Sequence, residues 1–186
     1  TCMPEPHPLG ARQLHFAGLQ DVGLALSMGR SVVSNTVNAD GRSAVMITGA
    51  NQGGKSSFLR SVGLAQVMMQ CGMFVAANTF ASEISTGVFT HYKREEDAAL
   101  QSGKLDEELA RMSAIADRIT SNSIVLFNES FAATNEREGS EIAGQITRAL
   151  VEKGIRVFYV THLYAFARGL YEGRAGSALY RARGQR

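Results

Sequence analysis

The stretch Gly49-Ala50-Asn51-Gln52-Gly53-Gly54-Lys55-Ser56 decides the fold, because it satisfies the pattern G-x-x-x-x-G-K-[ST] of a phosphate-binding loop. A short apolar run of the buried-strand type, Ala44-Val45-Met46-Ile47, comes directly before it. Apolar residues from Phe58 to Met69 follow at mostly helical spacing and predict a helix of about 16 residues. Strand, glycine-rich loop and helix, in that order, are the context that such a loop requires.

The residue types of this loop indicate its ligand. Glycines let the backbone wrap closely, so that successive N–H groups point at phosphate oxygens, and the following helix adds the positive end of its dipole. Lys55 is expected to reach the β and γ phosphates, and the Ser56 hydroxyl to ligate magnesium. A chance match in a chain of this length has odds on the order of one per cent. We therefore predict a site for ATP and Mg²⁺, with these nucleotide-binding residues: Gly49, Ala50, Asn51, Gln52, Gly53, Gly54, Lys55, Ser56 and Ser57.

Two further strands of the buried type are expected at Ile124-Val125-Leu126-Phe127 and Val157-Phe158-Tyr159-Val160, with a helical stripe from Ile142 to Val151 between them. This repetition predicts an α/β fold with a largely parallel sheet and helices on both faces. Ligands of such sheets bind at the carboxyl ends of the strands. The polar residues that follow the three strands are therefore expected to face one cleft.

An amphipathic helix is expected from Leu105 to Ile119, with an apolar stripe at spacings of three and four residues. Its charged residues, which include Glu108 and Arg111, are expected on a wet face, because such a charge run is more often a solvated surface than a binding site.

Asn128 and Glu129 directly follow the second strand. A carboxylate at this place can orient and deprotonate the attacking water in phosphoryl transfer. P-loop enzymes normally hold magnesium through an Asp at the end of such a strand. Asn128 can instead hydrogen-bond a water on the metal, but it brings no negative charge. The alternative interpretation makes Glu129 an ordinary surface carboxylate.

Thr161 and His162 follow the third strand. A histidine there can contact the γ phosphate or hold the attacking water, whereas an isolated histidine would more often cap a helix or lie in the core. The order of loop, acid and histidine at three successive strand ends is much harder to obtain by chance than any one of the three.

Composition limits the class of protein. The 186 residues are 45% hydrophobic and 19% charged with a formal net charge of +2, which is typical of one globular domain and predicts no nucleic-acid partner for this chain. Cys2 and Cys71 have no zinc or redox spacing, so a reduced, cytoplasmic location is the default. The apolar stretches are interrupted well before the ~20 residues that a bilayer requires, so no membrane partner is expected.

We expect a single domain over residues 1–186. Within it, residues 1–42 lead into the nucleotide site, 43–170 form the P-loop core, and 171–186 form a truncated or loosely ordered tail. The run from Ser31 to Val37 is compatible with a short strand. The composition of both ends suggests an excised domain, or the ordered part of a longer chain.

Together these residues resemble the ATPase domain of the MutS family of mismatch-repair proteins, a branch of the ABC-type P-loop ATPases. The resemblance is densest from Ile47 to Ser56, where the family typically reads I-T-G-P-N-M-G-G-K-S, and Asn51 with the paired glycines separates this loop from generic P-loops. It covers roughly Pro6 to Leu170 and continues in family order through these positions: Gly72 to Ala77, Ser102, Gly103, Glu129, Thr134, Gly139, Thr161 and His162.

The resemblance implies roles for individual residues. Glu129 would be the general base, and His162 would contact the γ phosphate or its water. Two such domains close head to tail around two nucleotides, so a homodimer or a pseudo-symmetric dimer is implied, with DNA held by domains outside this chain. The residues implied at the contact between the two domains are Ser102, Gly103, Thr134 and Asn135.

Four departures from the family pattern indicate a divergent homologue. Asn128 replaces the family's Asp, and Ala50 replaces a Pro. Lys104-Leu105-Asp106 stands where the family has a Ser-Thr-Phe run that reaches the partner's γ phosphate, and Val32 offers no aromatic ring to adenine.

The expected function is that of an ATP-binding and ATP-hydrolysing domain that couples nucleotide state to dimerisation and DNA binding. Because of Asn128, a nucleotide-dependent switch with negligible hydrolysis is the alternative. A transporter ATPase ranks third, because the L-S-G-G-Q signature is missing.

Overall fold

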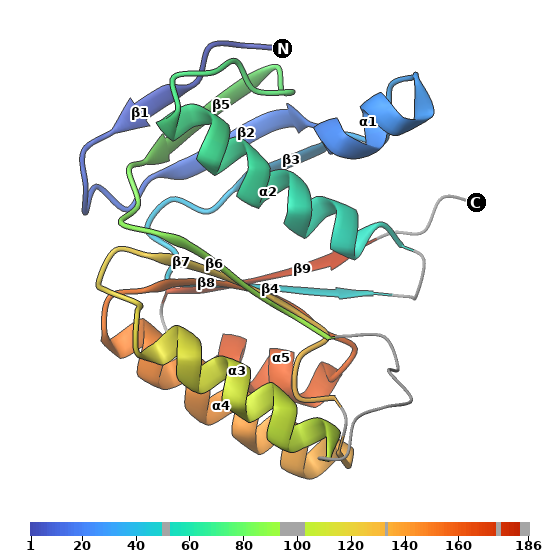
Figure 1. The fold of residues 1–186 in the computed structure, drawn as a ribbon, viewed down its shortest axis with the longest axis vertical. Helices are drawn as coiled ribbons and strands as arrows, with labels where there is room; N and C mark the ends of the chain where they lie inside the picture. The colour runs from blue at the N-terminus through green and yellow to red at the C-terminus, as the bar shows by residue number, and fades with distance from the viewer. Residues whose placement is uncertain (50–52, 94–102, 133, 174–175, 183–186) are drawn as a thin grey trace.

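A five-stranded parallel sheet forms the centre of the molecule (Figure 1). The computed structural model describes residues 1–49, 53–93, 103–132, 134–173 and 176–182. The strands lie in the order β6-β7-β8-β4-β9, and every neighbouring pair is parallel. Their bounds are β4 (Ala44–Gly49), β6 (Val88–Tyr92), β7 (Ile124–Asn128), β8 (Arg156–Val160) and β9 (Ser177–Ala182). The predicted parallel sheet of an α/β fold is confirmed.

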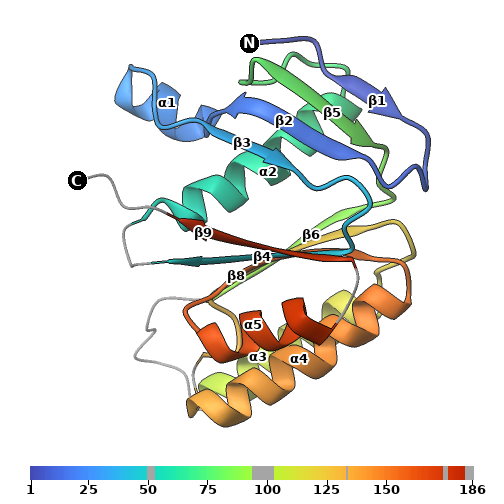
Figure 2. The same cartoon turned by 180° about the vertical axis from the view of Figure 1, so that it is seen from behind.

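Helices cover both faces of this sheet, as predicted (Figures 1 and 2). Helix α2 (Lys55–Gln70) packs on one face, where Val45 and Ile47 of β4 join its core. The other face carries Met46 and packs against three helices: α3 (Lys104–Ala116), α4 (Glu136–Glu152) and α5 (Tyr164–Gly173). Because side chains alternate along a strand, neighbouring residues of β4 point to opposite faces of the sheet and join the hydrophobic cores there. In the part of the chain that is described, no helix is long and apolar enough to cross a bilayer.

A second sheet, which the sequence analysis did not anticipate, lies beyond α2. Its strands are β1 (Glu5–His7), β2 (Leu14–Leu19), β3 (Asn35–Asn38) and β5 (Thr79–Glu83), in the order β1-β5-β2-β3. Strand β2 is antiparallel to β3 and β5, and β1 is parallel to β5. The short helix α1 (Val22–Met28) connects β2 to β3. The strand expected from Ser31 to Val37 is present only at its end, as β3.

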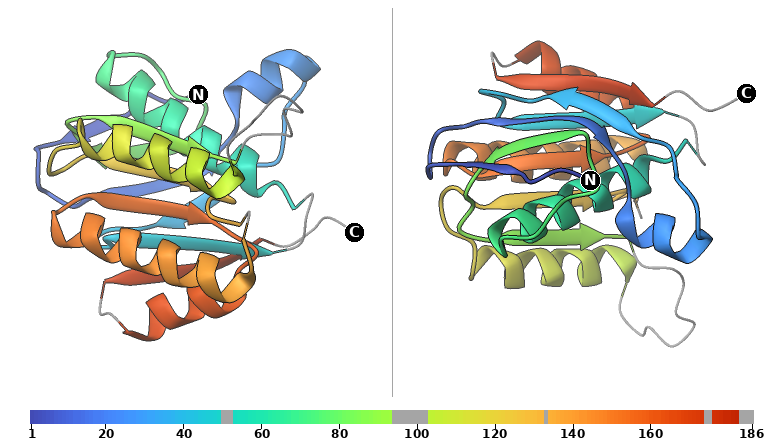
Figure 3. Two further views of the ribbon diagram at one scale, coloured as in Figure 1. Left: turned by 60° about the horizontal axis from the view of Figure 1, so that its bottom comes forward. Right: turned by 90° about the horizontal axis from the view of Figure 1, so that it is seen from above.

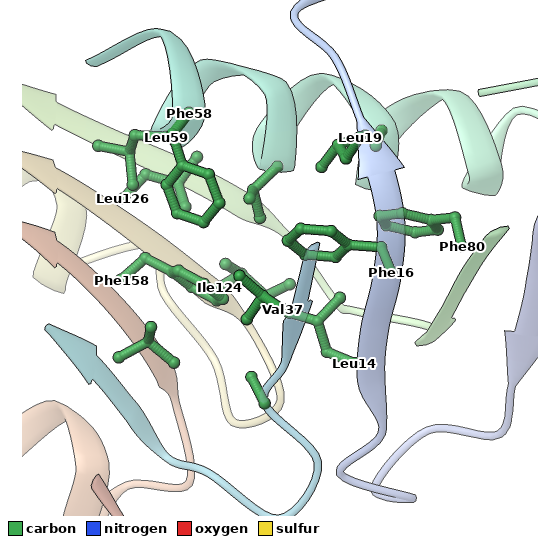
Figure 4. Packing of buried hydrophobic residues seen from close by; sticks show 14 of the residues in the cluster. Leu14, Phe16, Leu19, Val37, Phe58, Leu59, Phe80, Ile124, Leu126 and Phe158 are labelled. Atoms are coloured by element: carbon green, nitrogen blue, oxygen red, sulfur yellow. The ribbon is translucent and has the colours of Figure 1, made fainter. Parts of the chain in front are cut away.

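Helix α2 lies between the two sheets, so one hydrophobic core joins all three layers (Figure 4). Phe58 of α2 lies 6.2 Å from Phe16 of β2 between ring centroids, and Phe16 stacks on Phe80 of β5 at 5.9 Å. On the opposite side, a Cβ atom on Gly63 would lie 2.6 Å from the Leu126 side chain of β7, so glycine permits the close approach of helix and sheet. Figure 3 shows the small sheet on one side of the larger sheet and the layer of α3, α4 and α5 on the other.

The expected loosely ordered tail, residues 171–186, is wrong where the structure describes it. Helix α5 continues to Gly173, and residues 177–182 form β9, which pairs in parallel with β4 from Ala44 opposite Ser177 to Gly49 opposite Ala182. Strand β9 lies at the edge of the sheet and therefore lacks the continuous apolar run of a strand with two neighbours. Residues 183–186 lie outside the described part.

Candidate functional site

Three strands of the parallel sheet, β4, β7 and β8, end at one edge of the molecule, and the polar residues that follow them line one pocket of about 540 Å³. The lining residues are Gly53, Gly54, Lys55, Ser56, Ser57, Lys93, Glu129 and His162. The prediction of one shared cleft is confirmed. The chemical roles assigned to these residues remain predictions.

The loop after β4 ends in a glycine that starts α2. Gly54 has a φ of 74°, in the left-handed region that glycine adopts without strain, and it caps the helix without a side-chain hydrogen bond. The first turn of any helix leaves N–H groups without partners in the helix, and these form an anion site together with the helix dipole. The N-terminus of α2, which follows the described part of the loop, therefore faces the pocket. Ala50, Asn51 and Gln52 lie outside the described residues.

Lys55 crosses the loop from its place at the start of α2. The side chain is 95% buried, and its Nζ donates to the carbonyl oxygen of Gly49 at 2.9 Å. The same Nζ lies 3.9 Å from Oε1 of Glu129. A cation is thus held between the end of β4 and the end of β7, where an anionic ligand on the helix terminus would meet it.

Glu129 turns toward the pocket because its backbone adopts a φ of 54° directly after β7. Its N–H still donates to the carbonyl oxygen of Val160 at 2.9 Å, so the start of the turn stays tied to β8. Its carboxylate is 20% exposed, lies near Lys55 through Oε1 and is hydrogen-bonded to Nδ1 of His162 through Oε2. This pairing disfavours the interpretation of Glu129 as an ordinary surface carboxylate.

The described hydrogen bond of the His162 ring is to Glu129 and not to the backbone at the start of α5. Just before that helix, the Thr161 hydroxyl accepts the N–H of Leu163 at 3.0 Å. The His162 side chain is 53% exposed and lies outside the core. Both alternatives considered for an isolated histidine are therefore excluded, and the ring is left beside the Glu129 carboxylate.

Ser56 and Asn128, the residues predicted to hold magnesium, are adjacent. The Ser56 hydroxyl donates to Oδ1 of Asn128 at 3.1 Å. Both groups are neutral oxygen ligands, whereas Mg²⁺ is usually bound through one or two carboxylates together with substrate phosphates. Among the described residues there is no cluster of three or more His, Cys, Asp or Glu side chains that could hold a metal. Among the described residues that line the pocket, the one carboxylate is that of Glu129, which already lies beside Lys55 and His162, so these residues fit a magnesium ion poorly.

Lys93 is a pocket residue that the sequence analysis missed. It follows β6, the outer neighbour of β7, and its N–H donates to the carbonyl oxygen of Asn128 at 2.9 Å. The strand before it, Val88-Phe89-Thr90-His91-Tyr92, is interrupted by polar residues and gives no signal of a buried strand. A count of four strand ends, instead of three, would have placed Lys93 at the pocket.

The turn that carries Glu129 is anchored from behind by buried polar groups. Glu108 on α3 is 3% exposed, and its Oε2 accepts the N–H of Phe131 at 3.0 Å. Burial raises the pKa of the Glu108 carboxyl above its usual value. The prediction that places Glu108 on the wet face of this helix is therefore wrong, because the side chain turns inward to satisfy a backbone donor.

His91 on β6 completes this support. Its ring is fully buried, with Nδ1 at 2.7 Å from the Ser130 hydroxyl and Nε2 at 3.0 Å from the carbonyl oxygen of Glu108. Burial lowers the pKa of His91, so the neutral ring is favoured. Since a carbonyl oxygen only accepts, the neutral ring donates from Nε2 to Glu108. Its Nδ1 contacts the Ser130 hydroxyl, which also donates to the carbonyl oxygen of His91 at 2.6 Å. Residues 129–131 are thereby linked to both β6 and α3.

The residues implied at a contact with a second domain lie at two helix starts. Asn135 caps α4, because its Oδ1 accepts the N–H of Glu138 at 2.9 Å, and the Thr134 hydroxyl is hydrogen-bonded to the Glu138 carboxylate. Gly103 precedes α3, and Ser102 lies outside the described residues. Thr134 and Asn135 follow, along the chain, the turn that carries Glu129.

A second pocket of about 580 Å³ adjoins the first, because Gly53, Gly54 and Ser57 line both. Its remaining lining comes from α1, from the segment before β3 and from α2: Asp21, Leu24, Met28, Arg30, Ser31, Val32, Val33, Asn35 and Phe58. Apolar side chains together with a few polar groups are typical of small-molecule sites. Phe58 is the aromatic residue among these described lining residues.

Comparison with known proteins agrees with this architecture. The sequence profile described as MutS domain V matches residues 45–172. The chain is 34% identical over 134 residues to the DNA mismatch repair protein MutS of Thermotoga petrophila, which covers 72% of this chain and 17% of that protein. It is 32% identical over 141 residues to the endonuclease MutS2 of Thermus thermophilus (74% and 19%) and 28% identical over 137 residues to the MutS protein homolog 4 of Mus musculus (74% and 14%). The chain thus spans less than a fifth of the length of these relatives. Its match to the family profile, over most of its length, places it in the MutS family as a domain V.

Proposed function

We propose that this chain is the nucleotide-binding domain of a MutS-type protein and belongs to the ABC-type P-loop ATPases. It binds ATP and hydrolyses it. The observation that carries the proposal is the position of the Glu129 carboxylate between Lys55 and His162, at the mouth of the pocket where α2 begins.

The triphosphate lies on the first turn of α2 in this proposal. Backbone N–H groups of the loop and of the helix terminus bind its oxygens, and Lys55 exchanges its contact with the Gly49 carbonyl for the β and γ phosphates. The nucleoside extends into the second pocket past the shared glycines, where the base packs against Val32 and Phe58. The two adjoining pockets have room for both halves of the nucleotide.

Glu129 acts as the base in this proposal. Its carboxylate accepts the proton of the attacking water, and His162, hydrogen-bonded to the other carboxylate oxygen, orients that carboxylate or holds the same water. The anchored turn of residues 129–131 holds the carboxylate in place, so that less entropy is lost when the base and the water reach the reactive geometry.

The coupling to other parts of the protein is inferred from the relatives. Proteins named for DNA mismatch repair are similar to this chain, so we propose that two copies close around two nucleotides and that DNA is bound by domains outside this chain. Thr134, Asn135, Gly103 and Ser102 form the proposed contact with the second copy, and the cytoplasm is the proposed location. The chain alone then binds ATP and binds DNA poorly, so tight, salt-sensitive DNA binding by the chain would contradict this proposal.

Asn128 favours a second candidate, a nucleotide-dependent switch that hydrolyses ATP negligibly. The amide oxygen of Asn128 is hydrogen-bonded to Ser56 and places no negative charge beside the phosphates. In that case the bound nucleotide would control assembly through its presence alone.

The experiment compares the steady-state release of phosphate from ATP by the chain and by three variants. Glu129→Gln removes the proposed base, Asn128→Asp restores a charge, and Glu141→Gln changes an exposed carboxylate on α4 as a control. An ATPase loses at least about a hundredfold in turnover with Glu129→Gln and little with Glu141→Gln. Turnover in none of the four proteins, with ATP binding retained, favours the switch, and absence of ATP binding refutes both candidates.

A further inference from the structure

Among the described residues that line the phosphate pocket, positive charges outnumber negative ones. Its lining contains two lysines, Lys55 and Lys93, and one described carboxylate, that of Glu129. This carboxylate already lies beside Lys55 and is hydrogen-bonded to His162. On this described lining, an entering cation would meet two positive charges and a carboxylate that already has two partners.

The oxygen ligands expected to hold the metal carry no charge. Ser56 donates its hydroxyl proton to Asn128, so the two groups satisfy each other at 3.1 Å. Mg²⁺ gives up its bound water reluctantly and is usually bound by one or two carboxylates as well as by phosphates. Neutral oxygens that already share a hydrogen bond would add little to the binding free energy of Mg²⁺.

Lys93 brings a positive charge close to Asn128, where a metal ion would otherwise be expected. Its backbone N–H is bonded to the carbonyl oxygen of Asn128, so the start of its side chain is fixed beside the end of β7. The side chain is exposed and lines the pocket, and no ion pair of Lys93 occurs among the described residues. An ammonium group on a flexible stem binds phosphate as a compact point charge.

We infer that the pocket binds nucleoside triphosphates without a divalent cation, because Lys93, together with Lys55, neutralises the phosphate charge that a metal ion ordinarily neutralises. The inference rests on the proposed function, since it concerns the same nucleotide. It assigns to Lys93 a binding role that depends on the absence of a metal, and it makes Asn128 part of the same arrangement. The neutral amide avoids the repulsion that a carboxylate would exert on the uncompensated phosphates.

The test measures the equilibrium binding of a fluorescent ATP analogue to the chain, once in EDTA and once with excess Mg²⁺. The variants are Lys93→Gln, Lys93→Arg and Asn128→Asp, with Lys153→Gln as a matched control, because Lys153 is an exposed lysine after α4 at the opposite end of the strands. Circular dichroism and thermal melting establish that each variant is folded.

The unaltered chain is expected to bind with affinities that differ by less than about threefold between EDTA and Mg²⁺. Lys93→Gln is expected to weaken binding about tenfold in EDTA, the size of a charged hydrogen bond, and much less in Mg²⁺. Lys93→Arg retains most of the affinity, and Lys153→Gln changes nothing. Asn128→Asp weakens binding in EDTA and strengthens it in Mg²⁺, because the added carboxylate repels phosphate and attracts the metal.

Two results would overturn the inference alone while the proposed function stands: binding that requires Mg²⁺, or a loss with Lys93→Gln that is equal in both conditions. Absence of binding in both conditions would overturn the inference together with the proposed function. The two failures are thus distinguishable in one set of titrations.

Discussion

The carboxylate of Glu108 on α3 accepts the backbone N–H of Phe131, two residues after Glu129, at a distance of 3.0 Å. The turn between these residues has positive φ angles at both Glu129 (54°) and Phe131 (60°), which L-amino acids rarely adopt. Glu108 thus pins a backbone turn from which the proposed base projects, and α3 is part of the support of the pocket although it contributes no side chain to it.

We expect Glu108→Ala to lower the free energy of unfolding by about 1–3 kcal/mol, because it leaves the buried N–H of Phe131 without an acceptor. Glu108→Gln retains an acceptor and should destabilise the protein much less. Urea denaturation of both variants measures the difference. Equal losses in the two variants would show that the hydrogen bond to Phe131 contributes nothing.

The stability of the protein relative to Glu108→Gln should depend on pH. Burial raises the pKa of the Glu108 carboxyl in the folded protein above its usual value of 4.5. The folded state therefore binds this proton more tightly than the unfolded state, so its contribution to stability is fully present below pH ~4 and decreases as the pH rises through the folded pKa. Denaturation at several pH values from 4 to 8 tests this sign. A gain of the wild type over the Gln variant with rising pH would contradict it.

Gly139→Ala should destabilise the protein by about 1–3 kcal/mol through overpacking. A Cβ atom at this position in the first turn of α4 would lie 2.3 Å from the carbonyl oxygen of Phe131, and a backbone atom cannot rotate away. Gly169→Ala in α5 is the matched control, because nothing lies within 4 Å of its Cβ, and it should stabilise the helix by up to about 1 kcal/mol. Thermal unfolding of the two variants should shift the melting temperature in opposite directions.

Asp21→Ala should weaken nucleotide binding at the second pocket. Asp21 is 2% exposed, and its carboxylate accepts the N–H of Leu24 at 3.1 Å, which caps α1, and the Nε of Arg60 at 2.7 Å. Loss of the cap costs about 1 kcal/mol and loosens α1, which forms one wall of that pocket. Asp21→Asn keeps the cap and should bind nucleotide more tightly than Asp21→Ala in a titration with a fluorescent analogue. The same affinity in both variants would mean that α1 does not contribute.

Arg156→Met should destabilise the fold by about 3–5 kcal/mol without changing the affinity for nucleotide, because it leaves Glu83 buried without its partner. The Arg156 guanidinium is 3% exposed and lies 3.1 Å from Oε1 of Glu83, at the end of β8 opposite the pocket. A double variant with Glu83→Gln should lose less than the sum of the single losses, since the two side chains interact directly. Additive losses would indicate that the pair is not coupled.

Much of the parallel sheet and its pocket could be predicted from the sequence, because the signals are local. The glycine-rich loop, the apolar run before it and the helical pattern after it lie in one stretch, and α2 covers Lys55–Gln70 as expected. Glu129 and His162 could be placed at the same edge, since parallel strands end there together.

The remainder depends on contacts between distant residues. Strand β1 has three residues and pairs with β5, more than 70 positions along the chain, and neither has an apolar run that marks it as a strand. Lys93 reaches the pocket only because β6 pairs with β7. Glu108 resembles any charged residue of an amphipathic helix, and its burial follows from a backbone donor 23 positions away.

The position of α2 between the two sheets makes it a mechanical link. Its first turn borders the pocket, while its apolar side chains contact β2 and the parallel sheet at once. Close-packed interiors resist compression and transmit strain. Binding or loss of a phosphate that displaces the first turn would therefore move α2 as a whole. The small sheet packed on α2 would move with it, so the displacement would not be confined to the loop.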